Sequence, residues 1–229
     1  MTRQYRMARP EEHRALMVQD ARAFGDSTTS VSIDRSVART RVEELRVLEE
    51  DGVRLGLLLA RGQPVFWGGR PVPASQVSGL SVGAEHRGRG VATDLLRAYL
   101  AEVRERGAAI STLFPAAVQL YRRAGYEYAG TWTLYEAAAR HLPVGWPEGW
   151  RARPVPADDP GPLQERFVRV APGRDGQVDR DANWWRHFLL GERGSGPPQV
   201  FLVDGPGGPG GWAVLTVSSD VSASSEVRT

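Results

Sequence analysis

The segment between Val77 and Leu100 constrains the fold more than any other part of the chain. An alternating apolar run bounded by glycine predicts a strand that ends near Val82. After Gly90, apolar residues recur at the spacing of an amphipathic helix. The glycine-rich stretch Arg87–Thr93 therefore joins a strand to the start of a helix.

This loop has the features of an anion site. The first amides of a helix lack intrahelical acceptors and lie at the positive end of the helix dipole. Gly88 and Gly90 carry no Cβ that would keep a phosphate from the backbone, and Arg87 and Arg89 add positive charge. We therefore expect the loop to bind a phosphate group.

Two common nucleotide-binding patterns do not fit the loop. A P-loop requires Lys followed by Ser or Thr after its last glycine, where this chain has Val91 and Ala92. A dinucleotide fingerprint requires a third glycine, where this chain has Thr93. Both interpretations are therefore disfavoured.

The loop resembles the acetyl-CoA pyrophosphate loop of the GNAT superfamily of N-acetyltransferases, R/Q-x-x-G-x-G/A, which Arg87–Ala92 matches at every fixed position. Downstream, Leu120–Tyr126 reads Leu-Tyr-Arg-Arg-Ala-Gly-Tyr and resembles the second GNAT signature, a tyrosine followed shortly by Gly-Tyr or Gly-Phe. In this form, and in the run Glu85–Val91, the chain is similar to the enhanced intracellular survival (Eis) family.

The resemblance implies acetyl-CoA as cosubstrate and acetyl transfer to a primary amine of the aminoglycoside, polyamine or protein-lysine class. It implies that Tyr121 is the general acid, since a phenol with a pKa of about 10 can protonate a thiolate. The alternative interpretation of Tyr121 is that it is an aromatic core residue packed on the sheet. The Val82 N–H would polarise the thioester oxygen. The residues expected to contact the cofactor are Leu80, Ser81, Val82, Arg87, Gly88, Arg89, Gly90, Val91, Ala92, Thr93, Ala116 and Ala117.

The identity of the general base, which would deprotonate the amine, stays open. Asp20, Asp26 and Glu85 are acidic residues of the catalytic half that could face an amine, but we interpret each as a solvated surface charge. His86 is interpreted as a loop residue near the diphosphate. In Eis-like enzymes the base is the C-terminal carboxylate of a later domain, a role that Thr229 does not match.

The order of predicted elements is that of an α/β GNAT fold, a central mixed sheet flanked by helices. Asp51-Gly52 predicts a tight hairpin turn, and Gly68-Gly69 predicts the tip of an extra hairpin arm. The expected strands are 4–8, 45–50, 53–60, 65–72 (the arm), 77–82, 108–114 and 131–135, and the expected helices are 11–24, 33–41, 91–100 and 116–124.

The Pro- and Gly-rich stretch 143–149 predicts a domain boundary. Beyond it, a strand at 150–156, helices at 163–170 and 181–190, and strands at 200–203 and 212–217 repeat the opening order of the chain. We expect a GNAT domain at 1–142, a partial second GNAT-like domain at 143–217 and a disordered tail at 218–229. Eis-like proteins continue further, so we expect a truncated relative.

Composition narrows the function classes. The chain has no cysteine, which excludes disulfides and thiolate zinc sites, and no metal is expected. No membrane-length apolar stretch or signal peptide is evident, so we expect a cytoplasmic protein without a membrane partner. All 29 basic residues are arginine, but 27 acidic residues are interspersed and the net charge is only +2, which disfavours nucleic acid.

Two questions stay open in the sequence. We interpret Trp184-Trp185 as core or interface rather than as a cofactor site. The oligomeric state is not fixed, although a half-built second domain would leave this apolar face in need of a cover, which a homo-oligomer would supply. A non-catalytic acyl-CoA-binding or scaffolding fragment of a larger Eis-like protein is the alternative function, because the family's base and third domain are missing from this chain.

Overall fold

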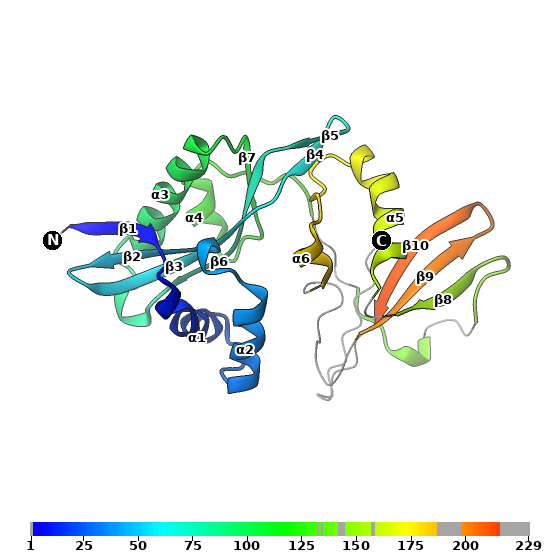
Figure 1. Ribbon diagram of the computed structural model, residues 1–229, viewed down its shortest axis with the longest axis horizontal. Helices are drawn as coiled ribbons and strands as arrows, with labels where there is room; N and C mark the ends of the chain where they lie inside the picture. The colour runs from blue at the N-terminus through cyan, green and yellow to red at the C-terminus, as the bar shows by residue number, and fades with distance from the viewer. Residues whose placement is uncertain are drawn as a thin grey trace. The chain divides into compact units, whose positions relative to one another are not determined.

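Five strands form one mixed sheet in the N-terminal half of the chain, as the computed structural model shows (Figure 1). Their order is β1-β2-β3-β6-β7. The first four pair antiparallel, whereas β6 and β7 are parallel and are connected through a helix. The bounds are β1 (Arg3–Met7), β2 (Leu45–Glu50), β3 (Val53–Gly62), β6 (Ala74–Val82) and β7 (Ile110–Leu113).

The structure describes residues 2–131, 133, 135–141, 145–156, 159–186 and 198–215. Contacts divide these residues into two units. The first comprises Met1–Val65 and Pro71–Ala129, and the second comprises Phe66–Arg70 and the described part of Gly130–Thr229. The predicted domain limit at residue 142 stays a prediction, and the predicted tail at 218–229 lies outside the described residues.

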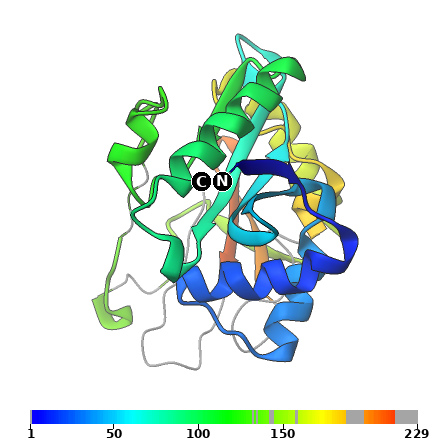
Figure 2. The same ribbon diagram turned by 90° about the vertical axis from the view of Figure 1, so that its left-hand side faces the viewer.

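Helices cover both faces of the five-stranded sheet (Figure 2). On one face, α1 (His13–Phe24) and α2 (Ser30–Arg39) pack on a core that includes Val47, Leu57 and Leu59. On the other face, α3 (Val91–Glu105) and α4 (Val118–Arg122) pack on a core that includes Leu58 and Val77. Neighbouring strand residues point to opposite faces, so one strand such as β3 serves both cores.

The local signals in this half predicted most of the turns. Asp51 and Gly52 adopt φ values of 50° and 78° between β2 and β3, as a two-residue hairpin turn requires. Gly25 ends α1 in the left-handed conformation. The second helix begins at Ser30 rather than at the predicted Ile33, because the Thr29 side chain accepts a hydrogen bond from the Ser32 amide and caps it there.

Strand β6 changes its pairing in the middle. Its ladder with β3 is interrupted at Ser78, which is left out between the pairs Val77–Ala60 and Gly79–Leu59. Its parallel ladder with β7 runs from Ala74–Ile110 to Val77–Leu113 and ends there. Beyond Val77, the edge of β6 that had faced β7 is therefore without a strand partner among the described residues.

The structure differs from the prediction after β7. Helix α4 covers Val118–Arg122 rather than 116–124, since Ala117 has a non-helical φ of −137°. The strand predicted at 131–135 is absent at the described positions 131, 133 and 135, and positions 132 and 134 lie outside the described residues. Just before these positions, the Glu127 carboxylate accepts hydrogen bonds from the Arg122 side chain and from the Tyr128 amide, so that amide is not part of a strand ladder.

The second unit contains a smaller antiparallel sheet of order β10-β9-β8. A helix follows its first strand, and a hairpin supplies the other two, which is the same order as β1, α1, β2 and β3 in the first unit. The bounds are β8 (Arg151–Val155), α5 (Gly161–Val170), α6 (Ala182–Trp184), β9 (Gln199–Gly205) and β10 (Gly208–Leu215).

The two tryptophans interpreted as core or interface belong to the core of the second unit. Trp185 is only 2% exposed and packs edge-on against Phe167, with ring centroids 5.5 Å apart. The guanidinium of Arg180 lies over the Trp184 ring at 3.9 Å from its centroid. The prediction that these tryptophans need an external cover is therefore wrong for Trp185, because its own unit covers it.

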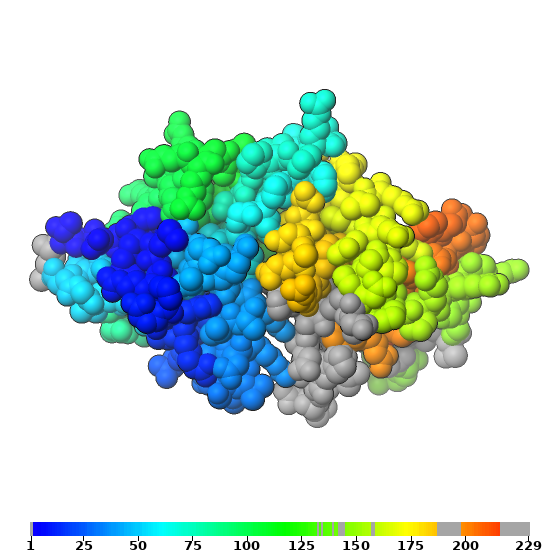
Figure 3. All heavy atoms as spheres, in the orientation of Figure 1, coloured from blue at the N-terminus to red at the C-terminus, as the bar shows by residue number. Residues whose placement is uncertain are grey.

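The predicted hairpin arm forms as β4 (Val65–Trp67) and β5 (Arg70–Val72). Its tip belongs to the second unit, where Phe66 joins the core and exchanges backbone hydrogen bonds of 2.8 Å with Gln177 and Gly176. Figure 3 shows the cyan atoms of the tip beside the yellow atoms that follow α5. The second unit thus includes a short piece of chain that is distant in sequence from the rest of it.

Candidate active site

The loop between β6 and α3 exposes its backbone. Gly88 and Gly90 have φ values of 74° and 76°, which residues with side chains rarely adopt. A Cβ at Gly88 would meet no atom within 4 Å. Gly90 is the N-cap of α3 and no described side chain caps the helix there, so the first amides remain available to a ligand.

Arg3 of β1 holds this loop in place. Its guanidinium donates to the Arg89 carbonyl oxygen at 2.9 Å and to the carboxylate of Asp94 in the first turn of α3. Sequence reasoning missed Arg3, because nothing in the sequence places residue 3 beside residue 89. The charge of Arg3 is therefore used to fix the start of the helix.

The two arginines of the loop differ in their surroundings. The Arg89 side chain donates to Glu50 Oε2 at 2.9 Å, so much of its charge is balanced within the protein. The Arg87 side chain is exposed and its Nε approaches the Val82 carbonyl oxygen at 3.4 Å. Of the two, Arg87 retains more positive charge for a phosphate.

The backbone of Val82 faces the unpaired edge of β6. The Gly83 amide donates to the Leu55 carbonyl of β3 at 3.0 Å. Successive backbone groups along a strand point in opposite directions, so the Val82 N–H points away from β3. This is the edge that β7 no longer covers, which leaves the amide available as a hydrogen-bond donor.

The other predicted contact residues belong to the segments next to the place where β6 and β7 part, which we call the opening. Leu80 and Ser81 lie on β6 between the bulge and Val82, with Ser81 buried and Leu80 half-buried. Ala116 and Ala117 are exposed and lie between β7 and α4. In the first turn of α3, Val91 is buried and Ala92 and Thr93 are half-buried, so these residues offer mainly backbone.

Tyr121 is buried on the α3 side of the sheet. It is 7% exposed and packs edge-on against Tyr126, with centroids 6.1 Å apart. It belongs to the same core cluster as Val77, where β6 and β7 part. Its hydroxyl makes no hydrogen bond to a described residue. Burial raises the pKa of Tyr121 above its usual 10, so the phenol is protonated at neutral pH.

Asp20 of α1 lies against β6 on the opposite face. Its Oδ1 is 3.1 Å from the position that a Cβ on Gly79 would occupy, and this oxygen is buried without a partner among the described residues. Burial, together with the nearby Asp26, raises the pKa of Asp20 to about 6. The interpretation of Asp20 as a solvated surface charge is therefore wrong, because the side chain folds inward.

The other candidate bases are less enclosed. Asp26 and Glu85 are exposed, in agreement with their interpretation as surface charges. His86 lies 3.4 Å from Glu85 Oε1 and from the Arg89 guanidinium, beside the phosphate loop. Within the described part of the chain, no three His, Cys, Asp or Glu side chains are grouped as metal ligands would be.

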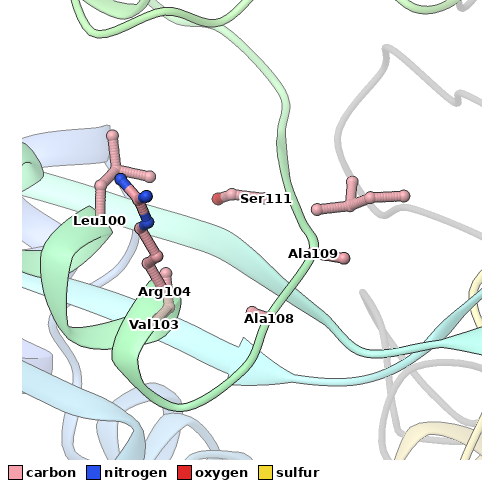
Figure 4. A pocket seen from close by; sticks show the side chains of 7 residues that line it. Leu100, Val103, Arg104, Ala108, Ala109 and Ser111 are labelled. Carbon is pink, nitrogen blue, oxygen red and sulfur yellow. The ribbon is translucent and has the colours of Figure 1, made fainter.

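A pocket of about 390 Å³ lies elsewhere, between the second half of α3 and the start of β7. Figure 4 shows Leu100 and Arg104 on the helix, with Ser111 pointing toward them from the strand. The phosphate loop is at the other end of α3, so this pocket is separate from the site described above.

No described helix is long and apolar enough to span a membrane.

A model of the acetyltransferase (GNAT) domain matches residues 4–129. The chain belongs to the GNAT acetyltransferase family. An uncharacterized N-acetyltransferase of Streptomyces coelicolor is 30% identical over 234 residues, which cover 95% of this chain and 56% of that protein. One of Streptomyces avermitilis is 35% identical over 129 residues, 52% of this chain and 30% of that protein. The match thus spans about half the length of the first relative and about a third of the length of the second.

Solved structures of GNAT proteins share the fold. A GCN5-related N-acetyltransferase of Anabaena variabilis superposes with a TM-score of 0.76 at 23% identity, covering 96% of this chain and 56% of that one. Eis1 of Mycobacterium abscessus superposes with a TM-score of 0.64 at 20% identity, and the match covers 93% of this chain and 52% of Eis1. The fold thus agrees with the resemblance to Eis-like proteins seen in the motifs.

GNAT acetyltransferases use acetyl-CoA, and the residues present fit it. The open space over Gly88 and the uncapped start of α3 suit a pyrophosphate. The unpaired edge of β6 suits an extended amide-bearing arm, since amides can pair with a free strand edge. These three observations concern backbone geometry, which explains why glycine spacing and strand patterning could predict the region.

Proposed function

We propose that the chain is an acetyl-CoA-dependent N-acetyltransferase that acts on a primary amine. The observation that carries the proposal is the parting of β6 from β7 after Val77. It is accompanied by a helix start that no described side chain caps and by a buried tyrosine whose hydroxyl bonds to no described residue. The acceptor class, whether aminoglycoside, polyamine or protein lysine, follows from the resemblance to Eis-like enzymes.

The chain's own residues have distinct tasks in this proposal. The amides from Gly88 to Thr93 and the Arg87 side chain hold the diphosphate. The Val82 N–H donates to the thioester oxygen, where negative charge develops. Tyr121 gives its phenolic proton to the departing sulfur, and its raised pKa keeps that proton in place until the thiolate forms. Bound acetyl-CoA supplies the activated acetyl group.

The experiment is acetyl transfer by the purified chain. Acetyl-CoA binding is measured by calorimetry, and release of free thiol is followed with a panel that contains an aminoglycoside, spermidine and a lysine peptide. Thiol release that depends on one of these amines, with the acetylated amine identified by mass spectrometry, is the expected result. Binding of acetyl-CoA without amine-dependent thiol release would instead support the non-catalytic acyl-CoA-binding alternative.

A further inference from the structure

Two buried polar atoms without partners lie on one face of β6. They are Oδ1 of Asp20 and Oγ of Ser81, and neither makes a hydrogen bond to a described residue. Gly79, against which Asp20 packs, pairs with Leu59, and Ser81 pairs with Leu57. Both leucines belong to the core under α1, so Gly79 and Ser81 point to the α1 side. The two orphaned oxygens therefore belong to the same face of the same short stretch.

The absence of a side chain at Gly79 makes room for the carboxylate. A Cβ there would lie 3.1 Å from Asp20 Oδ1 and 3.4 Å from the Leu59 Cβ, tighter than most ordinary contacts. Gly79 directly follows the bulge at Ser78, where β6 loses its pairing with β7. The carboxylate is thus placed against the stretch of strand that borders the opening.

A buried acceptor without a donor is costly and uncommon in native proteins. A protonated amine is a donor that satisfies such an oxygen, and its charge complements the carboxylate. The hydroxyl of Ser81 can accept or donate a second hydrogen bond to the same ligand. Both groups therefore match the acceptor side of an acetyl transfer.

We propose that Asp20 is the general base that removes a proton from the acceptor ammonium, and that Ser81 helps to orient the amine. This inference rests on the proposed function. Tyr121 lies in the core on the α3 side, so base and acid approach the opening from opposite faces of the sheet. That arrangement suits an amine that enters from one side while sulfur leaves on the other.

The protons balance in this scheme. The ammonium nitrogen loses two protons as the C–N bond forms and the C–S bond breaks. One goes to Asp20 Oδ1 or Oδ2 and then to solvent. The phenolic proton of Tyr121 moves to the sulfur, and the second proton from nitrogen restores the phenol through solvent. The products are the amide, free thiol and one released proton.

The charged groups around Asp20 support its basicity. Asp26, in the loop after α1, faces it with a like charge and adds to the effect of burial, and the pKa of Asp20 lies near 6. The Arg54 side chain of β3 donates a hydrogen bond to Oε1 of Gln19, the neighbour of Asp20 in the sequence, at 2.8 Å. Gly79 and Ser81 of β6 carry no charge. The carboxylate is therefore ionised at neutral pH yet more basic than an ordinary aspartate.

The test compares Asp20→Asn with wild type on two acceptors. One is an alkyl primary amine, which is protonated at neutral pH, and the other is an alkoxyamine, which is already neutral and needs no base. We expect the variant to lose roughly 10²-fold in kcat with the alkylamine and only a few-fold with the alkoxyamine. Acetyl-CoA affinity, measured by calorimetry, is unchanged. Asp34→Asn, in an exposed pair with Arg14, is the matched control and retains wild-type activity.

A readout without turnover completes the test. In the ligand-free protein, the carboxyl signal of Asp20 followed by carbon NMR titrates near pH 6 and moves to lower pH in Asp26→Asn. Equal losses with both acceptors, or full activity of Asp20→Asn, would overturn the role of Asp20 while leaving acetyl transfer intact. A wild-type chain that acetylates neither acceptor would instead overturn the proposed function and the base together.

Discussion

At the scale of single residues, the proposed site depends on two side chains, Tyr121 and Asp20, whose oxygens make no hydrogen bond to a described residue. Tyr121 and Asp20 are both enclosed, and burial shifts the pKa of each upward. For the phenol this preserves a proton to donate, and for the carboxylate it increases basicity. The same displacement of pKa therefore supports opposite roles.

Tyr121→Phe tests the acid. Removal of the hydroxyl should lower kcat by roughly 10²-fold, with acetyl-CoA affinity and thermal stability preserved because that hydroxyl bonds to no described residue. Tyr126→Phe is the matched control: its hydroxyl is hydrogen-bonded to Ser111 Oγ, so this variant should lose about 1 kcal/mol of stability and keep its kcat. A Tyr121→Phe enzyme with wild-type kcat would argue against the acid role.

Asp20→Asn should also change the pH dependence of stability. The pKa of Asp20 is about 6 in the folded chain and 3.8 as the reference value. Above pH 6 the charged side chain therefore destabilises the folded state, a penalty that shrinks as pH falls toward 4 and is absent below. We expect Asp20→Asn to be more stable than wild type at pH 8 by no more than about 3 kcal/mol, and equal below pH 4. Urea unfolding at both pH values measures this, and a less stable variant at pH 8 would indicate a structural role.

At the scale of elements, the connection from β6 through the loop to α3 carries the proposed cofactor site. Arg3 fixes the loop end of α3, and Arg46 of β2 donates to Glu102 farther along the helix at 2.6 Å. Burial disfavours the charged form of Glu102, but hydrogen bonds from Arg46 and Tyr5 outweigh it and lower its pKa. The helix is therefore held to the sheet near both ends.

Gly90→Ala tests the loop. A residue with a Cβ is strained at a φ of 76°, so we expect the variant to lose about 1 kcal/mol of stability. We also expect weaker acetyl-CoA binding, because the loop would relax to relieve the strain and its amides would turn away from the ligand. Gly107→Ala, at φ 84° beyond the other end of α3 with open space around it, carries similar strain away from the loop. Calorimetry should show weaker binding only for Gly90→Ala; equal affinities would remove the loop from the binding site.

At the scale of the whole molecule, the chain contains two units with separate cores. The second unit repeats the opening β-α-β-β order of the first around its own small sheet. That it is a partial second GNAT-like domain stays a prediction. Nothing in the described second unit duplicates the glycine loop after β6. We therefore propose that acetyl-CoA binds to the first unit.

Trp185→Ala tests this assignment. It leaves a cavity among Phe167 and Trp212 and should cost about 3–5 kcal/mol in the second core. Acetyl-CoA affinity should remain that of wild type, because the loop and the unpaired edge of β6 lie in the first unit. Hydrogen exchange would localise the loss of protection to the second unit, whereas a loss of acetyl-CoA binding would contradict the assignment.

The sequence by itself determined the features that arise from short stretches of chain. The Asp51-Gly52 turn, the Gly88 and Gly90 loop before α3 and the position of Tyr121 after β7 were predicted because turn conformation and helix starts depend on neighbouring residues. The family motifs are local in the same sense.

The tertiary structure alone decided which distant residues meet. It placed Arg3 on the loop, paired Arg89 with Glu50, buried Trp185 and turned Asp20 onto Gly79. It also showed no strand at residues 131, 133 and 135. None of these follows from periodicity, because burial and charge pairing are set by packing between segments far apart in the sequence.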